Sequence, residues 1–356
     1  MHIPDGYLSP ATCGVLGAVM IPVWATAARR GQRVVKSRYA PMMAVGAAYS
    51  FLVMMFNVPI PDGTTAHAVG AVLVACLLGP WAAVISVSVA LAIQALFFGD
   101  GGVLAFGANA FNMAFVMPFV GYGVYRLLAC NTSLTARRRA LAAGLGGYLG
   151  LNAAALAAAI EFGLQPDLFQ AADGTPLYAP FHLAQTIPAM ALAHLTVAGF
   201  VEFALTAGVV AYLQRANLPL LRINHPHVPE NGSPVPSRPL GWRWAFYGLA
   251  TMLVLTPLGL LAPGGAFGEA APGDLDLARY HLTAVPQGLN DYTGWWSNTV
   301  LGGYGFADGS HERLGYLISA LVGCLAVAAA IALVVGLVRA ASSLRDEDLE
   351  QPSLAP

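Results

Sequence analysis

The second residue of the chain is its strongest candidate for a metal ligand. The sequence begins Met1-His2-Ile3, and a free α-amine, the His2 amide nitrogen and the nearer imidazole nitrogen can close two adjoining chelate rings. Three nitrogens in this arrangement form three corners of a square plane, which favours Ni(II) or Cu(II) over Mg, Ca or Zn. One further imidazole would complete the plane. A His also occurs at position 2 by chance, so other residues must support this interpretation.

His67 is the best candidate for the fourth nitrogen. It follows Pro61-Asp62-Gly63-Thr64-Thr65-Ala66 at the start of a short apolar stretch, which we expect on the same membrane face as the N-terminus. A lone His at a helix start is more often capped or solvated than metal-binding, but the shared face favours a ligand here. The remaining candidates lie in longer loops of that face or on the opposite face: His182, His281, His225 and His227.

Polar side chains near a glycine-rich turn are candidates for orienting these ligands. Three glycines surround Asp100 in the turn 98–102, which predicts a close approach of backbone to another group. Asn109 and Asn112 share a helix face and are candidates for orienting a ligating imidazole through a hydrogen bond to it. Polar contacts between helices are an equal alternative for both. Asp5 of the N-terminal segment joins this candidate set.

The composition predicts an all-α, polytopic helical membrane protein. Hydrophobic residues make up 57% of the 356 residues and charged residues only 10%, against about 25% charged residues in soluble domains. The opening lacks a positive n-region and a cleavage site, so we expect no cleaved signal peptide. The four Cys fall in or beside apolar stretches without a C-x-x-C pair, which indicates buried thiols rather than disulfides.

We expect about 7–9 transmembrane helices. A shorter stretch, at 67–79, is too short to cross a bilayer alone and is expected to be re-entrant or half-length. The stretches of spanning length lie at about 9–28, 40–57, 81–98, 107–127, 140–162, 183–213, 243–262 and 314–338.

The basic residues predict the orientation. With these spans, 15 of the 17 Lys and Arg residues fall on one side, and only Arg279 and Arg313 fall on the other. The positive-inside rule then places the N-terminus outside and the C-terminus in the cytoplasm.

The chain divides into four parts. Residues 1–213 form a compact membrane domain, and 214–242 are a Pro-rich cytoplasmic linker. Residues 243–340 hold two spans joined by a long external loop, and 341–356 form a cytoplasmic tail that we expect to be frayed.

The sequence offers no route to ATP hydrolysis. Its single Lys, Lys36, follows no glycine-rich loop, whereas a P-loop needs a Lys that reaches the phosphates. No protease or hydrolase motif stands out, so we predict that the chain is not an enzyme. Transport energy would come from a partner or an ion gradient. Glu161, His194 and Glu202 are ionisable residues deep in apolar sequence, which makes them functional candidates.

These residues resemble a known family, the CbiM or NikM membrane subunit that captures substrate for energy-coupling-factor (ECF) type cobalt/nickel ABC importers. The resemblance covers most of residues 1–120. Four segments carry it: Met1-His2-Ile3-Pro4-Asp5-Gly6-Tyr7-Leu8-Ser9-Pro10, Gly63-Thr64-Thr65-Ala66-His67, Leu78-Gly79-Pro80-Trp81-Ala82-Ala83, and 98–113, from Phe98-Gly99-Asp100-Gly101-Gly102 to Asn109-Ala110-Phe111-Asn112-Met113.

The resemblance implies that Met1, His2 and His67 bind the transported Ni²⁺ or Co²⁺, with no prosthetic group. It also implies partners, namely a transmembrane coupling protein and two cytoplasmic ABC ATPases, in a prokaryotic plasma (inner) membrane. The ion would serve cobalamin synthesis or nickel metalloenzymes.

The region 243–340 resembles a small auxiliary subunit (NikN or PDGLE type) fused to the capture domain. Where many relatives have P-D-G-L-E, this chain has Pro286-Gln287-Gly288-Leu289-Asn290. The loss of both acids argues against a metal-handling role for that motif.

Two other functions remain open from the sequence. A stand-alone, proton-coupled secondary permease would use Asp100, Glu161, His194 and Glu202, although the two halves show no obvious inverted repeat. A membrane scaffold without a metal site would leave His67 replaceable.

Overall fold

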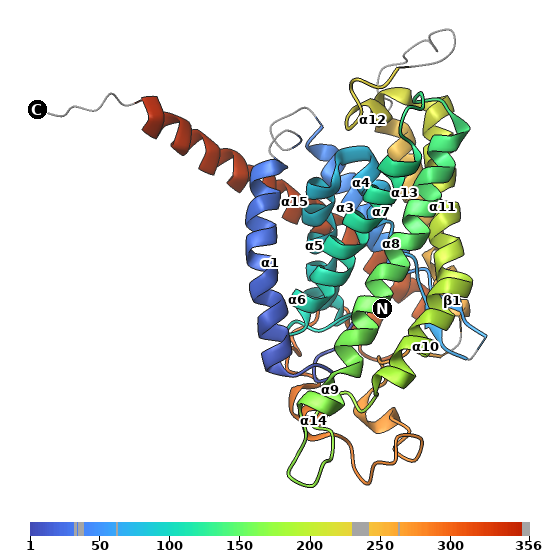
Figure 1. Cartoon of the computed structure of the whole chain (residues 1–356), viewed down its shortest axis with the longest axis vertical. Coiled ribbons are helices and arrows are strands. Elements are labelled where there is room, and N and C mark those ends of the chain that lie inside the picture. The colour runs from blue at the N-terminus through green and yellow to red at the C-terminus, as the bar shows by residue number, and fades with distance from the viewer. Residues whose placement is uncertain (32–33, 35–38, 62, 230–241, 263, 351–356) are drawn as a thin grey trace, which may run out of the picture.

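The chain folds into a bundle of helices with very little strand (Figure 1). The computed structural model describes residues 1–356 except 32–33, 35–38, 62, 230–241, 263 and 351–356. The predicted helical class is therefore confirmed for the described residues. One antiparallel pair of two-residue strands, β1 (Val58–Pro59) and β2 (Thr65–Ala66), interrupts the helices, with Val58 opposite Ala66.

The helices follow the apolar stretches of the sequence closely. The α-helices are α1 (Pro10–Arg30), α3 (Pro41–Met54), α4 (Ala71–Leu78), α5 (Pro80–Ile93), α6 (Phe106–Asn109), α7 (Met117–Leu128), α8 (Arg137–Gly163), α9 (Gln165–Leu168), α10 (Leu183–Ala193), α11 (Gly199–Ala216), α12 (Leu218–Arg222), α13 (Trp242–Leu255), α14 (Gln287–Tyr292) and α15 (Glu312–Glu350). Of three π-helical segments, η1 (Gln94–Phe98) extends α5, whereas η2 (Ala110–Val116) joins α6 to α7 and η3 (His194–Ala198) joins α10 to α11. The 3₁₀ turns are η4 (Thr256–Leu261), η5 (Pro272–Asp274) and η6 (Gly302–Tyr304).

Several helices are long and apolar enough to cross a membrane. Within the described residues there are five: Pro10–Arg30, Pro80–Phe98, Arg137–Leu168, Leu183–Ala216 and Glu312–Ala341. Two shorter apolar helices cover Pro41–Met54 and Ala245–Leu261. The chain is therefore a multi-pass membrane protein, while the total of seven to nine spans stays a prediction.

The short apolar stretch forms α4, a helix of 8 residues. At a rise of about 1.5 Å per residue, it reaches only about 12 Å. Nearly all of its side chains are buried against neighbouring helices, as expected for half-length helices at membrane depth. The Glu202 carboxylate of α11 accepts hydrogen bonds from the Val69 and Gly70 amides, both at 2.9 Å. This contact caps the start of α4, directly after His67.

The connectors lie at two opposite ends of the bundle (Figure 1). The turn after α7 and the helix α12 lie at one end, and the loops around α9 and α14 lie at the other. This is the separation that the charge pattern requires, and the assignment of either end to the cytoplasm stays a prediction. Residues 230–241 of the expected linker lie outside the described residues, and α11 and α12 occupy much of its first part.

The C-terminal region packs directly against residues 1–213. Helix α15 contacts α3 and α5, and a Cβ at Gly323 would overlap the Phe51 ring. The Tyr316 hydroxyl donates to the Met55 carbonyl at 2.7 Å. Helix α15 continues to Glu350, so residues 341–350 are helical where we expected a frayed tail.

Candidate metal site

The N-terminal segment runs into the bundle and is buried there. Met1 is 2% exposed and Ile3 is fully buried. The Asn109 side chain fixes this segment by accepting from the Ile3 amide at 2.8 Å and donating to the Ile3 carbonyl at 3.0 Å. The Gly102 amide donates to the same carbonyl at 2.8 Å. Asn109 thus positions the main chain of the residue after His2, and its supporting role in the metal site stays a prediction.

The glycine-rich turn allows the close approach that its sequence predicts. Gly101 has a φ of 80°, which L side chains rarely adopt. At Gly102, a Cβ would overlap the Asp5 carboxylate. That carboxylate accepts from the amides of 103–105 at 2.9–3.1 Å. Burial raises the pKa of Asp5, and these amides oppose the shift. Asp5 therefore holds the two segments together and does not reach an imidazole.

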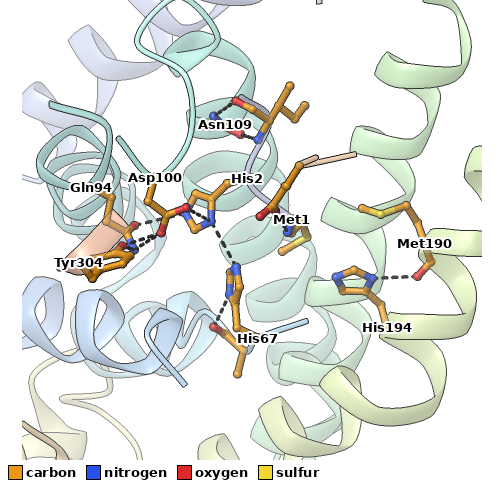
Figure 2. Close-up of polar contacts among 12 residues, drawn as sticks. Met1, His2, His67, Gln94, Asp100, Asn109, Met190, His194 and Tyr304 are labelled. Atoms are coloured by element: carbon orange, nitrogen blue, oxygen red, sulfur yellow. Dashed lines mark hydrogen bonds and ion pairs between the residues drawn. The ribbon is translucent and has the colours of Figure 1, made fainter. Parts of the chain in front are cut away.

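The hairpin of β1 and β2 delivers His67 to the N-terminal segment. The His67 ring is buried, and its Nδ1 donates to the Ala68 carbonyl at 3.0 Å. This bond leaves the lone pair on Nε2, which lies 3.2 Å from Nδ1 of His2. The two ring centroids are 5.0 Å apart. The two imidazoles that the sequence singled out, 65 residues apart, therefore lie side by side (Figure 2).

The His2 ring is fixed by polar side chains on its other sides. Its Nε2 lies 3.3 Å from Oε1 of Gln94, and its Nδ1 lies 3.3 Å from Oδ1 of Asp100. The Tyr304 hydroxyl donates to Asp100 and accepts from the Gln94 amide. Gln94, Asp100 and Tyr304 thus form one network around His2 (Figure 2). In the neutral ring, donation from Nε2 to Gln94 leaves the lone pair on Nδ1, the chelating nitrogen, facing Nε2 of His67, as a shared ion would require.

The Met1 amine makes an ion pair with a residue from the C-terminal region. It lies 3.0 Å from Oε1 of Glu269, whose side chain is 23% exposed. The positive amine is also close enough to His67 to affect its titration. Burial lowers the pKa of His67 well below its usual value, and the amine and His2 lower it further. The His67 imidazole is therefore neutral at ordinary pH.

The structure separates the predicted site residues into two groups. Met1, His2, His67 and Asp100 come together (Figure 2). Asn112 does not join them, because its amide donates to Glu161 at 2.8 Å. It therefore contacts a carboxylate and not the imidazole that we expected. In the described part of the chain, no three His, Cys, Asp or Glu side chains cluster well enough to hold an ion. A metal site here would therefore need main-chain nitrogens as further ligands.

Three residues of the site were not predicted from the sequence: Gln94, Glu269 and Tyr304. Gln94 is a polar residue in an otherwise apolar span, which is a usable signal. Glu269 is one of several acids in a long loop, and Tyr304 is one of 13 Tyr residues, so neither stands out. His194, predicted as an intramembrane candidate, donates from Nδ1 to the Met190 carbonyl at 2.8 Å. Its Nε2 has no hydrogen-bond partner.

Comparisons with known proteins relate the chain to metal transport proteins. The chain is 48% identical over 349 residues to a fused nickel transport protein, NikMN, from Rhodobacter capsulatus, covering 95% of this chain and 98% of that one. It is 46% identical to a probable fused nickel transport protein, LarMN, from Lactiplantibacillus plantarum, over 91% and 94% of the two chains. Both matches extend through the C-terminal region.

A solved structure and a family model match the first part of the chain. The crystal structure of a truncated transition metal transporter is 60% identical, with a TM-score of 0.55, over 60% of this chain and 98% of that one. The model of the cobalt uptake substrate-specific transmembrane region, CbiM, matches residues 2–220. With the buried N-terminal segment and the paired imidazoles already placed, this match is decisive: the chain belongs to the CbiM family.

Proposed function

We propose that this chain is the substrate-capture subunit of an ECF-type importer for Ni²⁺ or Co²⁺. The ion arrives from the outer face and is bound by four nitrogens: the Met1 amine, the His2 amide, Nδ1 of His2 and Nε2 of His67. Family membership and the nickel transport named for two full-length relatives support the class of substrate.

The observation that carries this proposal is the 3.2 Å between Nδ1 of His2 and Nε2 of His67. Imidazole nitrogens lie about 2.0–2.1 Å from a bound divalent ion, so neighbouring corners of a square plane are about 2.9 Å apart. The two rings need only a small shift to share an ion. The remaining two nitrogens belong to Met1 and His2 themselves, and the amine reaches the plane by turning away from Glu269.

Binding in this plane releases protons. The amine and the His2 amide must each lose a proton to solvent before they bind the ion, so affinity falls as the pH falls. The lowered pKa of His67 keeps its imidazole available at neutral pH. Acidification therefore weakens binding through the other ligands, namely the Met1 amine, the His2 amide and the His2 imidazole, each of which must be unprotonated to bind the ion.

Partners supply the energy in this proposal. Because the sequence has no P-loop Lys, a membrane coupling protein and two cytoplasmic ATPases would drive release inward. The order of divalent affinities places Cu²⁺ above Ni²⁺ and Co²⁺, so availability and the partners decide between the ions.

The test compares the untagged full-length chain with a version extended by several residues before Met1. We expect the untagged protein to bind one Ni²⁺ per chain and the extended version to lose at least about 100-fold in affinity, because the amine is displaced from the chelate. Metal analysis and calorimetric titration of the detergent-purified proteins measure both quantities.

His2→Ala and His67→Ala serve as matched variants, and His182→Ala is the control. His182 is more than half exposed and pairs with Asp167, so its replacement should leave binding intact. If the extended chain captures Ni²⁺ as tightly as the untagged chain, the N-terminal chelate is wrong.

A further inference from the structure

The external loop of the C-terminal region lies against the N-terminal segment. The Tyr7 hydroxyl donates to the Ala270 carbonyl at 2.7 Å, and a Cβ at Gly6 would lie 3.0 Å from Cα of Leu289. The Thr65 amide, two residues before His67, donates to the Gly265 carbonyl at 3.3 Å. The loop therefore contacts both segments that carry the proposed ligands.

A cavity of about 200 Å³ lies between this loop and the capture domain. Its lining includes Asp5, Tyr7, Glu269, Thr293 and Trp296. A volume of this size holds a hydrated ion, since one water occupies about 30 Å³ of liquid. The cavity is thus large enough to bind an ion beside the N-terminal segment.

Glu269 is the lining residue that joins this cavity to the nitrogen site. Its side chain is 23% exposed, whereas Met1 is 2% exposed. The Asp5 carboxylate, also in the lining, is engaged by three backbone amides. The Glu269 carboxylate contacts the Met1 amine through one oxygen. It is therefore reachable from solvent and already touches the first proposed ligand.

The loop also carries a net negative charge, which attracts cations. Between residues 262 and 313 the sequence has six acids, Glu269, Asp274, Asp276, Asp291, Asp308 and Glu312, against two bases, Arg279 and Arg313. This balance gives a net charge of −4, since six negative charges are offset by two positive ones. Of these acids, Glu269 lines the cavity, and a carboxylate in a cleft with protein walls attracts cations and raises association rates by about 10–10³-fold.

We propose that this cavity is the entry site for the hydrated divalent ion and that Glu269 is its carboxylate ligand. The inference rests on the proposed function. The ion binds the Glu269 oxygen in the cavity, and the amine leaves that carboxylate. The amine and the His2 amide each give a proton to water, and the ion moves onto the amine, the amide and Nδ1 of His2, and Nε2 of His67. The fused region thereby contributes to metal loading through Glu269, outside the altered motif at 286–290.

The experiment follows the binding of Ni²⁺, added as its chloride, to the untagged full-length protein by stopped-flow absorption of the square-planar complex. We expect Glu269→Gln to slow association about tenfold, with the final spectrum and the dissociation rate unchanged. Glu269→Asp should restore at least part of the rate. Native association should also slow as ionic strength rises.

Asp308→Asn is the matched control, since it removes the same charge from an exposed position of the same loop. It should leave the association rate within about twofold. An unchanged rate in Glu269→Gln, or a faster dissociation with normal association, would overturn the entry role. The second result would mean that Glu269 only supports the amine. If Glu269→Gln does not fold, Glu269→Asp and the salt dependence of native association decide the question.

The two proposals fail differently. If the native chain forms no square-planar Ni²⁺ complex, the proposed function itself is wrong and the entry site falls with it. If the complex forms and Glu269→Gln forms it equally fast, the entry site alone is wrong.

Discussion

His2 has a defined orientation because both of its ring nitrogens have buried neighbours. Gln94 accepts from Nε2, and the same Gln94 side chain donates to Tyr304 and Asp100. Partners of this kind fix the tautomer of a ligating imidazole, and their loss typically costs 10–100-fold in metal affinity. The buried position of Gln94 in η1 therefore gives it a larger role than its residue type indicates.

We predict that Gln94→Met lowers Ni²⁺ affinity about 10–100-fold, because a side chain of similar size removes the acceptor for His2. Calorimetric titration of the full-length protein measures the effect. Gln165→Met is the control, since Gln165 is also buried but accepts from the Ser9 amide, away from the imidazoles. Equal affinity losses in both variants would point to general destabilisation rather than to a role at His2.

At the residue scale, the sequence predicted the local part of the site better than the distant part. Met1 and His2 are adjacent, so the chelate that we propose for them can be derived from covalent connectivity alone. To predict the pairing of His2 with His67, it was enough to place both residues on the same face of the membrane. Glu269 and Tyr304 lie more than 200 positions from their partners, and no local pattern marks those contacts.

Among the elements, α4 positions His67 most directly. The helix is short and buried, and its first amides are satisfied by Glu202 rather than by a local cap. Glu202 was a candidate for proton-coupled transport on sequence grounds. Its carboxylate instead accepts from Val69, Gly70 and Thr206, which is a structural role beside the ligand loop.

We predict that Glu202→Ala destabilises the protein by at least about 2 kcal/mol, because two buried amides lose their acceptor. Ni²⁺ affinity should fall about tenfold as the loop of His67 loosens. Thermal unfolding and titration of the purified protein measure the two effects. Glu202→Gln keeps an acceptor oxygen and should lose less of both. Full stability in Glu202→Ala would contradict the capping role.

The sequence predicted which segments are helical but not their interruptions. The short length of α4 was predictable, because proline and glycine turns bound this apolar stretch on both sides. The π-helical segments η1 and η3, which carry Gln94 and His194, lie inside largely apolar stretches, where the hydrophobic pattern does not distinguish a π-helical segment from regular α-helix. Their positions depend on packing between helices.

For the whole molecule, the C-terminal region contributes more than a second membrane anchor. Helix α15 packs on α3 and α5, and the loop before it brings Glu269 and Tyr304 to residues 1–213. The sequence predicted the two apolar stretches and the loop between them. It did not predict where the loop docks, because that contact depends on shape and on main-chain hydrogen bonds such as Val300 to Phe97.

The ionisable residues in the bundle bear on how transport is driven. A proton-coupled permease would need them to form a connected path, but Glu161 contacts Asn112, Glu202 caps α4, and Asp100 joins the His2 network. Each carboxylate thus has a separate partner. This arrangement favours energy supplied by other proteins over a proton gradient.

We therefore predict that vesicles containing this chain alone bind Ni²⁺ but do not accumulate it, with or without a proton gradient. Adding the coupling protein, the two ATPases and ATP should produce uptake at least about tenfold above that background, because ATP hydrolysis then supplies the work of releasing a tightly bound ion. Accumulation of ⁶³Ni²⁺ measures the transport. A vesicle set with His67→Ala and all partners separates specific transport from leakage. Uptake by the chain alone that collapses with the proton gradient would instead establish the permease.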